Sequence, residues 1–392
     1  MFLPKINLFL KPNFIRTMKK LMFSLSVLLS GLSLNAQQYY PVAQPCDPDK
    51  VYTTMPYAAH EYLCVYKLNI TSQPYNKIPK EVFRYRNLRE LSLQNANISE
   101  IPVDIFLLDK LEVLDLSNNN LKSIPNTIGE LKNLRKLILS NNQLSTLPAT
   151  ISACKNLELL DITGNPIHAL PDEINNLQAL SSFKFSGNQI SDPKLMMSIV
   201  RQMKNITNLD LSGCSLNYLP SDIRNMKKLR ELNLSNNNLH FLPAEIGSLT
   251  NLEKLTLGAP GQPGNQVFDL PASMANMQNL RELNLGNNAF EEFPMVLTGM
   301  EKLVHVDLSN NKLQAIPAEI GMMRGLQRLN LTNNQIQDVP VEIGQLSQLG
   351  QFDYAGNPMT PAIETKIMEL MTGTYQAPQP TAPAPVKKPK KK

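Results

Sequence analysis

A 23-residue unit repeats almost without interruption from Val65 to Met359, and it limits the chain to a stacked, repetitive fold. Aligned on its first apolar residue, the unit reads L-x-x-L-x-L-x-x-N-x-L-x-x-[LI]-P-x-x-I-x-x-L-x-x. Thirteen units begin at Val65, Leu88, Leu111, Leu134, Leu157, Leu180, Ile206, Leu229, Leu252, Leu280, Leu303, Leu326 and Leu349. No unit can bury its own leucines, so neighbouring units must stack and share one core.

Each part of the unit has a mechanical role. In the copy that begins at Leu111, Leu114 and Leu116 point to one side of a short strand, because strand side chains alternate. Ile128 and Leu131, three residues apart, attach a helical turn to the core. Strands are narrower than helical turns, so the stack should bend, with parallel strands on its concave side. Residues Leu114, Leu137, Leu160 and Leu232 should then lie in one inner column.

Two further positions shape the loops of the unit. An Asn at the ninth position, as in Asn119, can donate and accept hydrogen bonds where the chain turns inward, and stacked units should form an asparagine ladder. A Pro such as Pro125 restricts the chain where it enters the helical turn.

Some units depart from this pattern. Gln73, Ala96 and Cys214 replace the ladder Asn in three of them. The unit that begins at Leu180 lacks the Pro, and residues 191–203 read as a longer capped helix. The unit that begins at Leu252 has five extra residues in a loop, which is either a ligand-contacting loop or a neutral insertion. This loop consists of Gly258, Ala259, Pro260, Gly261, Gln262, Pro263 and Gly264.

The repeated core resembles the leucine-rich repeat superfamily, and its L-P-x-x-I variant is most similar to the Ras-suppressor and plant intracellular Ras-group subclass. The resemblance covers about three quarters of the chain. Copies of that subclass are also common in bacterial proteins, and with the N-terminal signal described below we expect an exported bacterial member. The resemblance implies an α/β fold, a right-handed solenoid that recognises proteins on its concave face. It does not imply Ras binding, because the shared positions are core positions.

The two ends of the chain differ from the repeats. Met18, Lys19 and Lys20 precede an apolar run and Ala36, so residues 1–36 are predicted to be a secretory signal peptide, with Met18 as an alternative start. A membrane anchor is the alternative, but the run is short for a span. We expect an N-terminal cap at 37–64, repeats over 65–359 and a helical cap at 360–374, closed by Ile363, Ile367, Leu370 and Met371. The protein would be periplasmic, associated with the outer envelope or secreted.

The tail at 375–392 is Pro-rich and ends in five lysines. It reads as a disordered end or as an electrostatic contact with an anionic envelope. Without the signal and tail, 28 basic residues face 33 acidic ones, so the net charge of +5 does not indicate a nucleic-acid partner.

The four cysteines occupy two kinds of position. Cys154 replaces an apolar residue and Cys214 a ladder Asn, so both should be buried and inert. Cys46 and Cys64 flank the segment before the repeats, where a disulfide would suit an oxidising compartment.

The sequence has no motif for catalysis. Its four histidines are scattered, without H-E-x-x-H or zinc spacing, and there is no phosphate loop or G-x-S-x-G. His305 and Asp307 lie together on the predicted concave face without an aligned nucleophile. We therefore expect no enzyme activity, no cofactor and no metal. Effector ubiquitin ligases with such repeats carry a separate catalytic domain, and only a cap and tail follow Leu349 here.

An apolar group with a charged rim marks the predicted binding patch. Val113, Ile138 and Leu159 fall on three successive strands at positions that face outward, and we expect them to touch. The charged rim comprises Asp115, Lys136, Asp161 and Lys184. Scattered apolar surface residues are also normal.

The expected function is therefore a monomeric scaffold of the bacterial envelope or exterior that binds a protein or peptide on its concave face, without an integral membrane span. A structural or adhesive surface protein, and an effector that acts on host signalling, are the alternatives.

Overall fold

The computed structural model describes residues 46–55, 61–188, 190, 195, 199, 201, 203–258 and 264–376. The chain divides into two units, 1–48 and 49–392, and every element below belongs to the second. The predicted signal peptide, most of the basic tail and the centre of the insertion lie outside the described residues.

One parallel sheet runs through the second unit, and each strand pairs with the next along the chain. Its strands are β1 Val51–Tyr52, β2 Lys67–Asn69, β3 Glu90–Ser92, β4 Val113–Asp115, β5 Lys136–Ile138, β6 Leu159–Asp161, β7 Ser182–Lys184, β8 Asn208–Asp210, β9 Glu231–Asn233, β10 Lys254–Thr256, β11 Glu282–Asn284, β12 His305–Asp307, β13 Arg328–Asn330 and β14 Gln351–Asp353.

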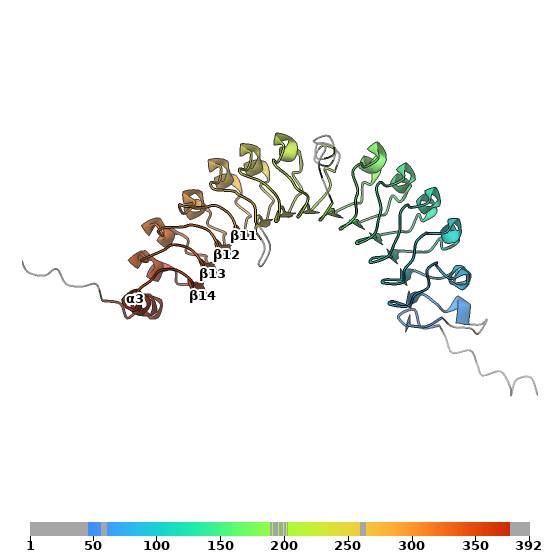
Figure 1. The fold of residues 1–392 in the computed structure, drawn as a ribbon, viewed down its shortest axis with the longest axis horizontal. Coiled ribbons are helices and arrows are strands. Elements are labelled where there is room, and N and C mark those ends of the chain that lie inside the picture. The colour runs from blue at the N-terminus through green and yellow to red at the C-terminus, as the bar shows by residue number, and fades with distance from the viewer. Residues whose placement is uncertain are drawn as a thin grey trace, which may run out of the picture. The chain divides into compact units, whose positions relative to one another are not determined.

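Short 3-10 turns alternate with the strands and form the convex side of the arc in Figure 1. They are η1 Glu61–Leu63, η2 Lys80–Arg84, η3 Val103–Leu107, η4 Asn126–Glu130, η5 Ala149–Ala153, η6 Asp172–Asn176, η7 Ser221–Asn225, η8 Ala244–Ser248, η9 Ala272–Asn276, η10 Met295–Gly299, η11 Ala318–Met322 and η12 Val341–Gln345. The leucine-rich repeat architecture predicted from the sequence is confirmed.

The register aligns equivalent residues of successive units. Leu114 pairs with Leu137, which pairs with Leu160, and the column continues through Phe183 and Leu209 to Leu232. The side chains of this column are buried in a core that is continuous along the stack. The predicted inner column is therefore confirmed, and it fixes which side chains face outward.

The asparagine ladder couples each unit to the one before it. Asn142 accepts the N–H of Leu121 at 2.9 Å through Oδ1. Its Nδ2 donates to the carbonyls of Leu116 at 3.0 Å and Leu139 at 2.9 Å. One buried amide thus joins the backbones of two units.

Cys214 takes the ladder position of its unit and Cys154 an apolar one, and both are free and buried. Cys214 donates from Sγ to the carbonyl of Phe185 at 3.3 Å, while its own N–H is accepted by Asn237 Oδ1. Burial raises the pKa of Cys154 to about 11 and that of Cys214 to about 12, so both thiols stay protonated and unreactive at neutral pH.

Each of the turns η2 to η12 follows its Pro directly. Pro125, the residue before η4, has φ −68° and ψ 151°, so the Pro holds an extended residue at the entrance of the turn. In the irregular unit, Leu195, Ile199 and Arg201 have helical backbone, and the rest of the predicted helix at 191–203 is not described apart from Met203.

Both ends of the stack differ from the expectation. The sheet begins earlier than predicted, because β1 lies in the N-terminal segment and pairs with β2, with Val51 opposite Lys67. At the other end, helix α3 (Pro361–Thr372) buries Ile367 and Leu370. Met371, expected on the same buried face, is 37% exposed.

Helix α3 packs beside η12 and is held there by a charged side chain. Lys366 Nζ lies 2.7 Å from Asp338 Oδ1 and donates to the carbonyl of Val339. The hydrogen bond from Lys366 lowers the pKa of Asp338 below its ordinary value of 3.8.

Substituting Asn142→Ala should lower the free energy of unfolding by about 1–3 kcal/mol, because it leaves the buried N–H of Leu121 unpaired. The carbonyls of Leu116 and Leu139 each lose one of two side-chain hydrogen bonds and keep the bond from a neighbouring ladder Asn. Chemical denaturation measures this difference. The control is Asn120→Ala at an exposed neighbouring position, which should cost less than about 0.5 kcal/mol. Equal losses in the two variants would contradict the role of the ladder.

The contact of Asp338 with Lys366 should stabilise the C-terminal cap only while Asp338 is ionised. A carboxyl whose pKa is lowered by folding contributes stability above its unfolded pKa, here 3.8, and loses it as the pH falls through the folded value. Asp338→Asn should therefore lower the thermal midpoint at about pH 7 but not at about pH 2. A midpoint reduced equally at both values would show that charge is not the cause.

Candidate functional site

Two rows of side chains face outward from the concave side of the sheet. The first row comes from the first residue of each strand and the second row from the third, since the middle residue points into the core. In β4, for example, Val113 belongs to the first row and Asp115 to the second.

The second row is largely occupied by internal hydrogen bonds. Asp210 Oδ1 accepts the N–H of Ser212 at 3.0 Å, and Asp307 Oδ1 accepts that of Ser309 at 2.9 Å. The same bond is made at Asp115, Asp161, Asn233, Asn284 and Asn330. These carboxylates and amides close the turn after the strand. This structural role explains why Asp or Asn recurs at the third strand position.

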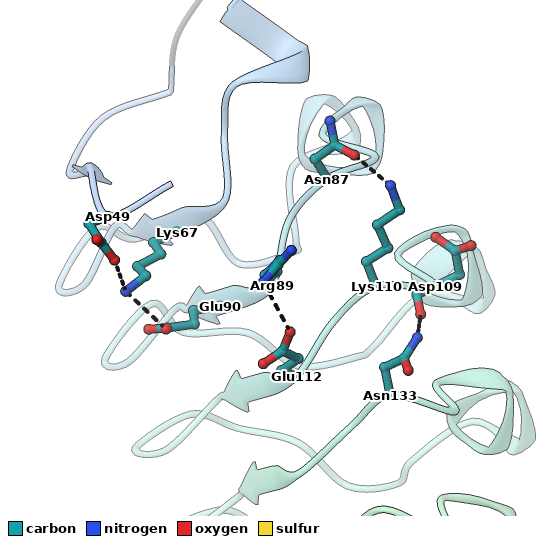
Figure 2. A network of polar contacts seen from close by, with 9 residues as sticks. All are labelled: Asp49, Lys67, Asn87, Arg89, Glu90, Asp109, Lys110, Glu112 and Asn133. Atoms are coloured by element: carbon teal, nitrogen blue, oxygen red, sulfur yellow. Dashed lines mark hydrogen bonds and ion pairs between the residues drawn. The ribbon is translucent and has the colours of Figure 1, made fainter. Parts of the chain in front are cut away.

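Charged pairs connect neighbouring strands in the N-terminal part. Lys67 lies 3.4 Å from Asp49 and 3.3 Å from Glu90, and Arg89 lies 3.7 Å from Glu112 (Figure 2). All five side chains are at least a quarter exposed, so each pair contributes little stability.

A second line of asparagines, which sequence analysis missed, lies behind these pairs. Asn133 donates to the carbonyl of Asp109 at 2.8 Å, one unit back, and Lys110 donates to Asn87 Oδ1 at 2.7 Å (Figure 2). In the sequence, these asparagines could have been recognised by the N-L dipeptide at the start of many units, as in Asn133 and Leu134. These asparagines connect each unit to the one before it by hydrogen bonds.

The predicted patch is not a continuous apolar centre. Val113 pairs with Lys136, which pairs with Leu159, so Lys136 separates the two apolar residues in the first row. Ile138 lies in the second row, between Asp115 and Asp161. The three apolar side chains therefore alternate with charged ones along the two rows, and Ile138 lies diagonally from Val113 and Leu159.

The rim of the predicted patch is also partly engaged. Asp115 is only 9% exposed, because its oxygens accept hydrogen bonds from Gln94 and Ser117. Asp161 lies 3.7 Å from Lys184, and Lys184 also lines a hollow of about 240 Å³ over β7–β10. Lys184 is thus the member of the predicted patch that lines this hollow.

The larger concave hollow lies farther along the sheet. It has a volume of about 460 Å³ over β9–β14 and shares Asn233, Lys254 and Thr256 with the hollow over β7–β10. Leu255, Leu283 and Val306 form its floor, and they belong to the buried core. The two hollows together follow the concave face over eight strands.

Four polar side chains of the first row cross this hollow on consecutive strands. They are Lys254, Glu282, His305 and Arg328. Lys254 Nζ lies 2.9 Å from Glu282 Oε2, and Arg328 lies 3.1 Å from His305 Nδ1. The hydrogen bond from Lys254 lowers the pKa of Glu282.

The protonation of His305 follows from this arrangement. Partial burial and the nearby Arg328 guanidinium lower the pKa of His305. The imidazole is then neutral at pH 7, and its Nδ1 accepts a hydrogen bond from Arg328. Glu282, 3.8 Å from the same nitrogen, therefore pairs with Lys254 rather than with His305.

The structure records few other functional signals. Cys46 and Cys64 are both disulfide-bonded. Within the described ranges, no three His, Cys, Asp or Glu side chains gather as metal ligands would. None of the described helices has the length and apolar character needed to cross a bilayer.

The ends of the insertion are packed tightly. A Cβ on Gly258 would lie 1.8 Å from the carbonyl oxygen of Gly286, and one on Gly264 would lie 1.4 Å from that of Asn287. Both positions therefore require glycine. Ala259, Pro260, Gly261, Gln262 and Pro263 lie outside the described residues.

Family models match several parts of the chain. A leucine-rich repeat region matches residues 46–163, the repeats of leucine-rich repeat and WD repeat-containing protein 1 match 274–372, and the leucine-rich repeat matches 205–226 and 228–249. No curated protein matches the sequence.

Solved structures are similar over most of the chain. A leucine-rich repeat protein of Leptospira interrogans is 28% identical with a TM-score of 0.58, covering 83% of this chain and 98% of its own. The plant peptide hormone receptor RGFR1, solved in complex with RGF2, is 29% identical with a TM-score of 0.59, covering 76% and 48%. An internalin of Listeria monocytogenes shares the fold, at 23% identity and a TM-score of 0.59, covering 79% and 92%.

Proposed function

We propose that this leucine-rich repeat protein binds a protein or peptide of mixed charge on its concave face. The observation that carries the proposal is the hollow of about 460 Å³ that Lys254, Glu282, His305 and Arg328 cross on four consecutive strands. A row that presents both charges and neutral donors and acceptors suits a polypeptide, which offers both charges and backbone amides.

The rigidity of the sheet supports the same function. Every strand is hydrogen-bonded to the next, and ladder amides such as Asn311 fix the turn behind the hollow. Side chains held on such a sheet lose little conformational entropy when a partner binds. The similarity to a receptor solved in complex with a peptide hormone is consistent with this use of the fold.

The predicted patch around Ile138 and the insertion at 258–264 remain further candidates. Ile138 is half-buried and faces the concave side, so it can still serve as a small apolar anchor. Gly258 and Gly264 fix the two ends of the insertion against the next unit.

A peptide selected from a random library on the full chain distinguishes these surfaces. We expect Glu282→Ala and Arg328→Ala to weaken its binding by more than about 1 kcal/mol, roughly fivefold, because both side chains cross the hollow. Isothermal titration measures the affinity. The matched control is Glu173→Ala on the exposed side of η6, which should leave it unchanged.

Two additional variants localise the site if the hollow is not used. A loss confined to Ile138→Asp would move the site to the predicted patch. A loss confined to deletion of residues 259–263 would move it to the insertion. Equal affinity in every variant would reject concave-face binding and favour a structural or adhesive role.

We further propose that the protein is exported after cleavage behind Ala36. The apolar run before Ala36 supports this, and so do the disulfide-bonded Cys46 and Cys64, since disulfides persist in oxidising compartments. N-terminal sequencing of the protein from its native envelope or medium should give Gln37 as the first residue. A chain that retains Met18 would contradict export by cleavage.

A further inference from the structure

Among the residues that the structure describes, β14 is the last strand of the sheet, and β13 is the one strand paired with it. In the interior of the stack, Leu116 N–H donates to Ile138 at 2.9 Å and Asn118 N–H to Ser140 at 2.8 Å, both in the next unit. Tyr354 and Gly356 hold the equivalent positions after β14. Within the part of the chain that the structure describes, neither N–H has an acceptor.

The core is also incompletely covered at this end. Leu329 and Leu331 in β13 and its following turn are fully buried, whereas Phe352 and Tyr354, the next residues of the same two columns, are partly exposed. Their rings lie 5.2 Å apart. Helix α3 packs beside η12, at the end of the row of turns, while β14 ends the row of strands (Figure 1).

A hollow of about 420 Å³ occupies this uncovered end. Phe352, Tyr354 and Met359 contribute apolar surface to it, and Asp353 and Glu364 contribute charge. Asn330 and Thr332 of the preceding unit also line it, so the hollow extends from β13 over β14 and the turn that follows. The side chains of a further strand beside β14 would pack against its Phe352 and Tyr354 walls.

Two carboxylates at this edge, those of Asp353 and Glu364, have no cationic partner within the described residues. Seven Asp or Asn residues of the second row, between β4 and β13, close their own turn through Oδ1, but Asp353 makes no such bond within the described residues. Its Oδ2 accepts a hydrogen bond from Gln351 at 2.7 Å. No Lys or Arg of the described chain lies within ion-pair distance of Asp353 or Glu364.

We propose that the edge of β14 is a second docking surface, which binds an extended segment of another protein as a fifteenth strand. The segment carries apolar side chains at alternate positions, over Phe352 and Tyr354, and a Lys or Arg between them, beside Asp353. Backbone hydrogen bonds to Tyr354 and Gly356 provide part of the affinity, as in other cases where a peptide extends a sheet.

A second copy of the chain fits this edge less well. Antiparallel pairing of β14 with its own copy, centred on Asp353, would place two Asp353 carboxylates directly opposite each other, which is unfavourable. A basic partner strand removes this repulsion. This surface shares Asn330 and Asp353 with the concave hollow. Its test is still distinguishable from that of the proposed function, because strand addition depends on backbone hydrogen bonds that methylation of the peptide removes.

The probe is a fluorescent peptide with the sequence of Leu326–Asn334, carrying Asn330→Lys, because it continues the repeat by one strand. In the register of the sheet, its Lys would lie beside Asp353. We expect saturable binding by fluorescence anisotropy to the full chain. Methylation of the peptide amide nitrogen at position 330 should weaken binding by at least about fivefold, since that N–H would pair with β14.

Charge exchange tests the predicted partner chemistry. Asp353→Lys should weaken the Lys peptide by about two- to fivefold, and a peptide with Glu at position 330 should regain that affinity. The matched control is Glu231→Lys in the middle of the sheet, which should leave both peptides unaffected. Circular dichroism confirms that each variant folds.

Three outcomes would overturn the proposal. The first is absence of saturable binding, or equal binding by the methylated peptide. The second is a chain truncated after Gln376 that binds the probe more than tenfold better than the full chain, which would make the tail the occupant. The third is a dimer, seen by sedimentation, that the probe dissociates, which would make a second copy the occupant.

Discussion

The side-chain amide of the ladder asparagine is the interaction on which the stack depends. At Asn165, Oδ1 accepts the N–H of Leu144 in the preceding unit, while Nδ2 donates to carbonyls of both units. A backbone that turns inward behind a strand cannot satisfy these groups by itself, and an unpaired group there would be costly. The amide solves this problem and at the same time fixes the spacing of neighbouring units.

That spacing governs the concave face. Because successive strands are in register, one side chain from each unit joins a row about 4.8 Å from the next. A partner therefore meets ordered rows rather than isolated residues. The two rows are not equivalent. In the second row, Asp307 Oδ1 accepts the backbone N–H of Ser309. In the first row, the Arg328 side chain contacts the His305 side chain and makes no hydrogen bond to the backbone within the described residues. The first row is consequently the freer one for recognition, and it contains the four side chains that cross the larger hollow.

Sequence periodicity could predict most of the fold. It identified the inner column at Leu114, the ladder at Asn142 and the burial of Cys214, because each of these follows from a position within one repeated unit. It could not predict β1, because Val51 and Tyr52 lie outside the repeat and are strand residues only through their pairing with β2.

The candidate site was harder to predict, for a physical reason. Counting outward positions treats Val113, Ile138 and Leu159 as neighbours, but the register places Lys136 between Val113 and Leu159. Burial of Asp115 by Gln94 depends on a side chain of another unit. The hollow over β9–β14 depends on the size and pairing of side chains such as Glu282 and Lys254, and no single-unit pattern encodes it.

The ends of a repeating stack follow different rules from its middle. Every interior strand is paired on both sides, so the repeat itself supplies no residue that would satisfy a free edge. Helix α3 covers the turns at the C-terminal end through Ile367, Leu370 and the bond from Lys366 to Asp338. Within the described part of the chain, the N–H of Tyr354 still lacks an acceptor. A solenoid that protected this edge would place a charged or bulged strand there. β14 instead offers two aromatic rings and the carboxylate of Asp353, which has no Lys or Arg partner within the described residues, a combination that suits a partner strand better than solvent.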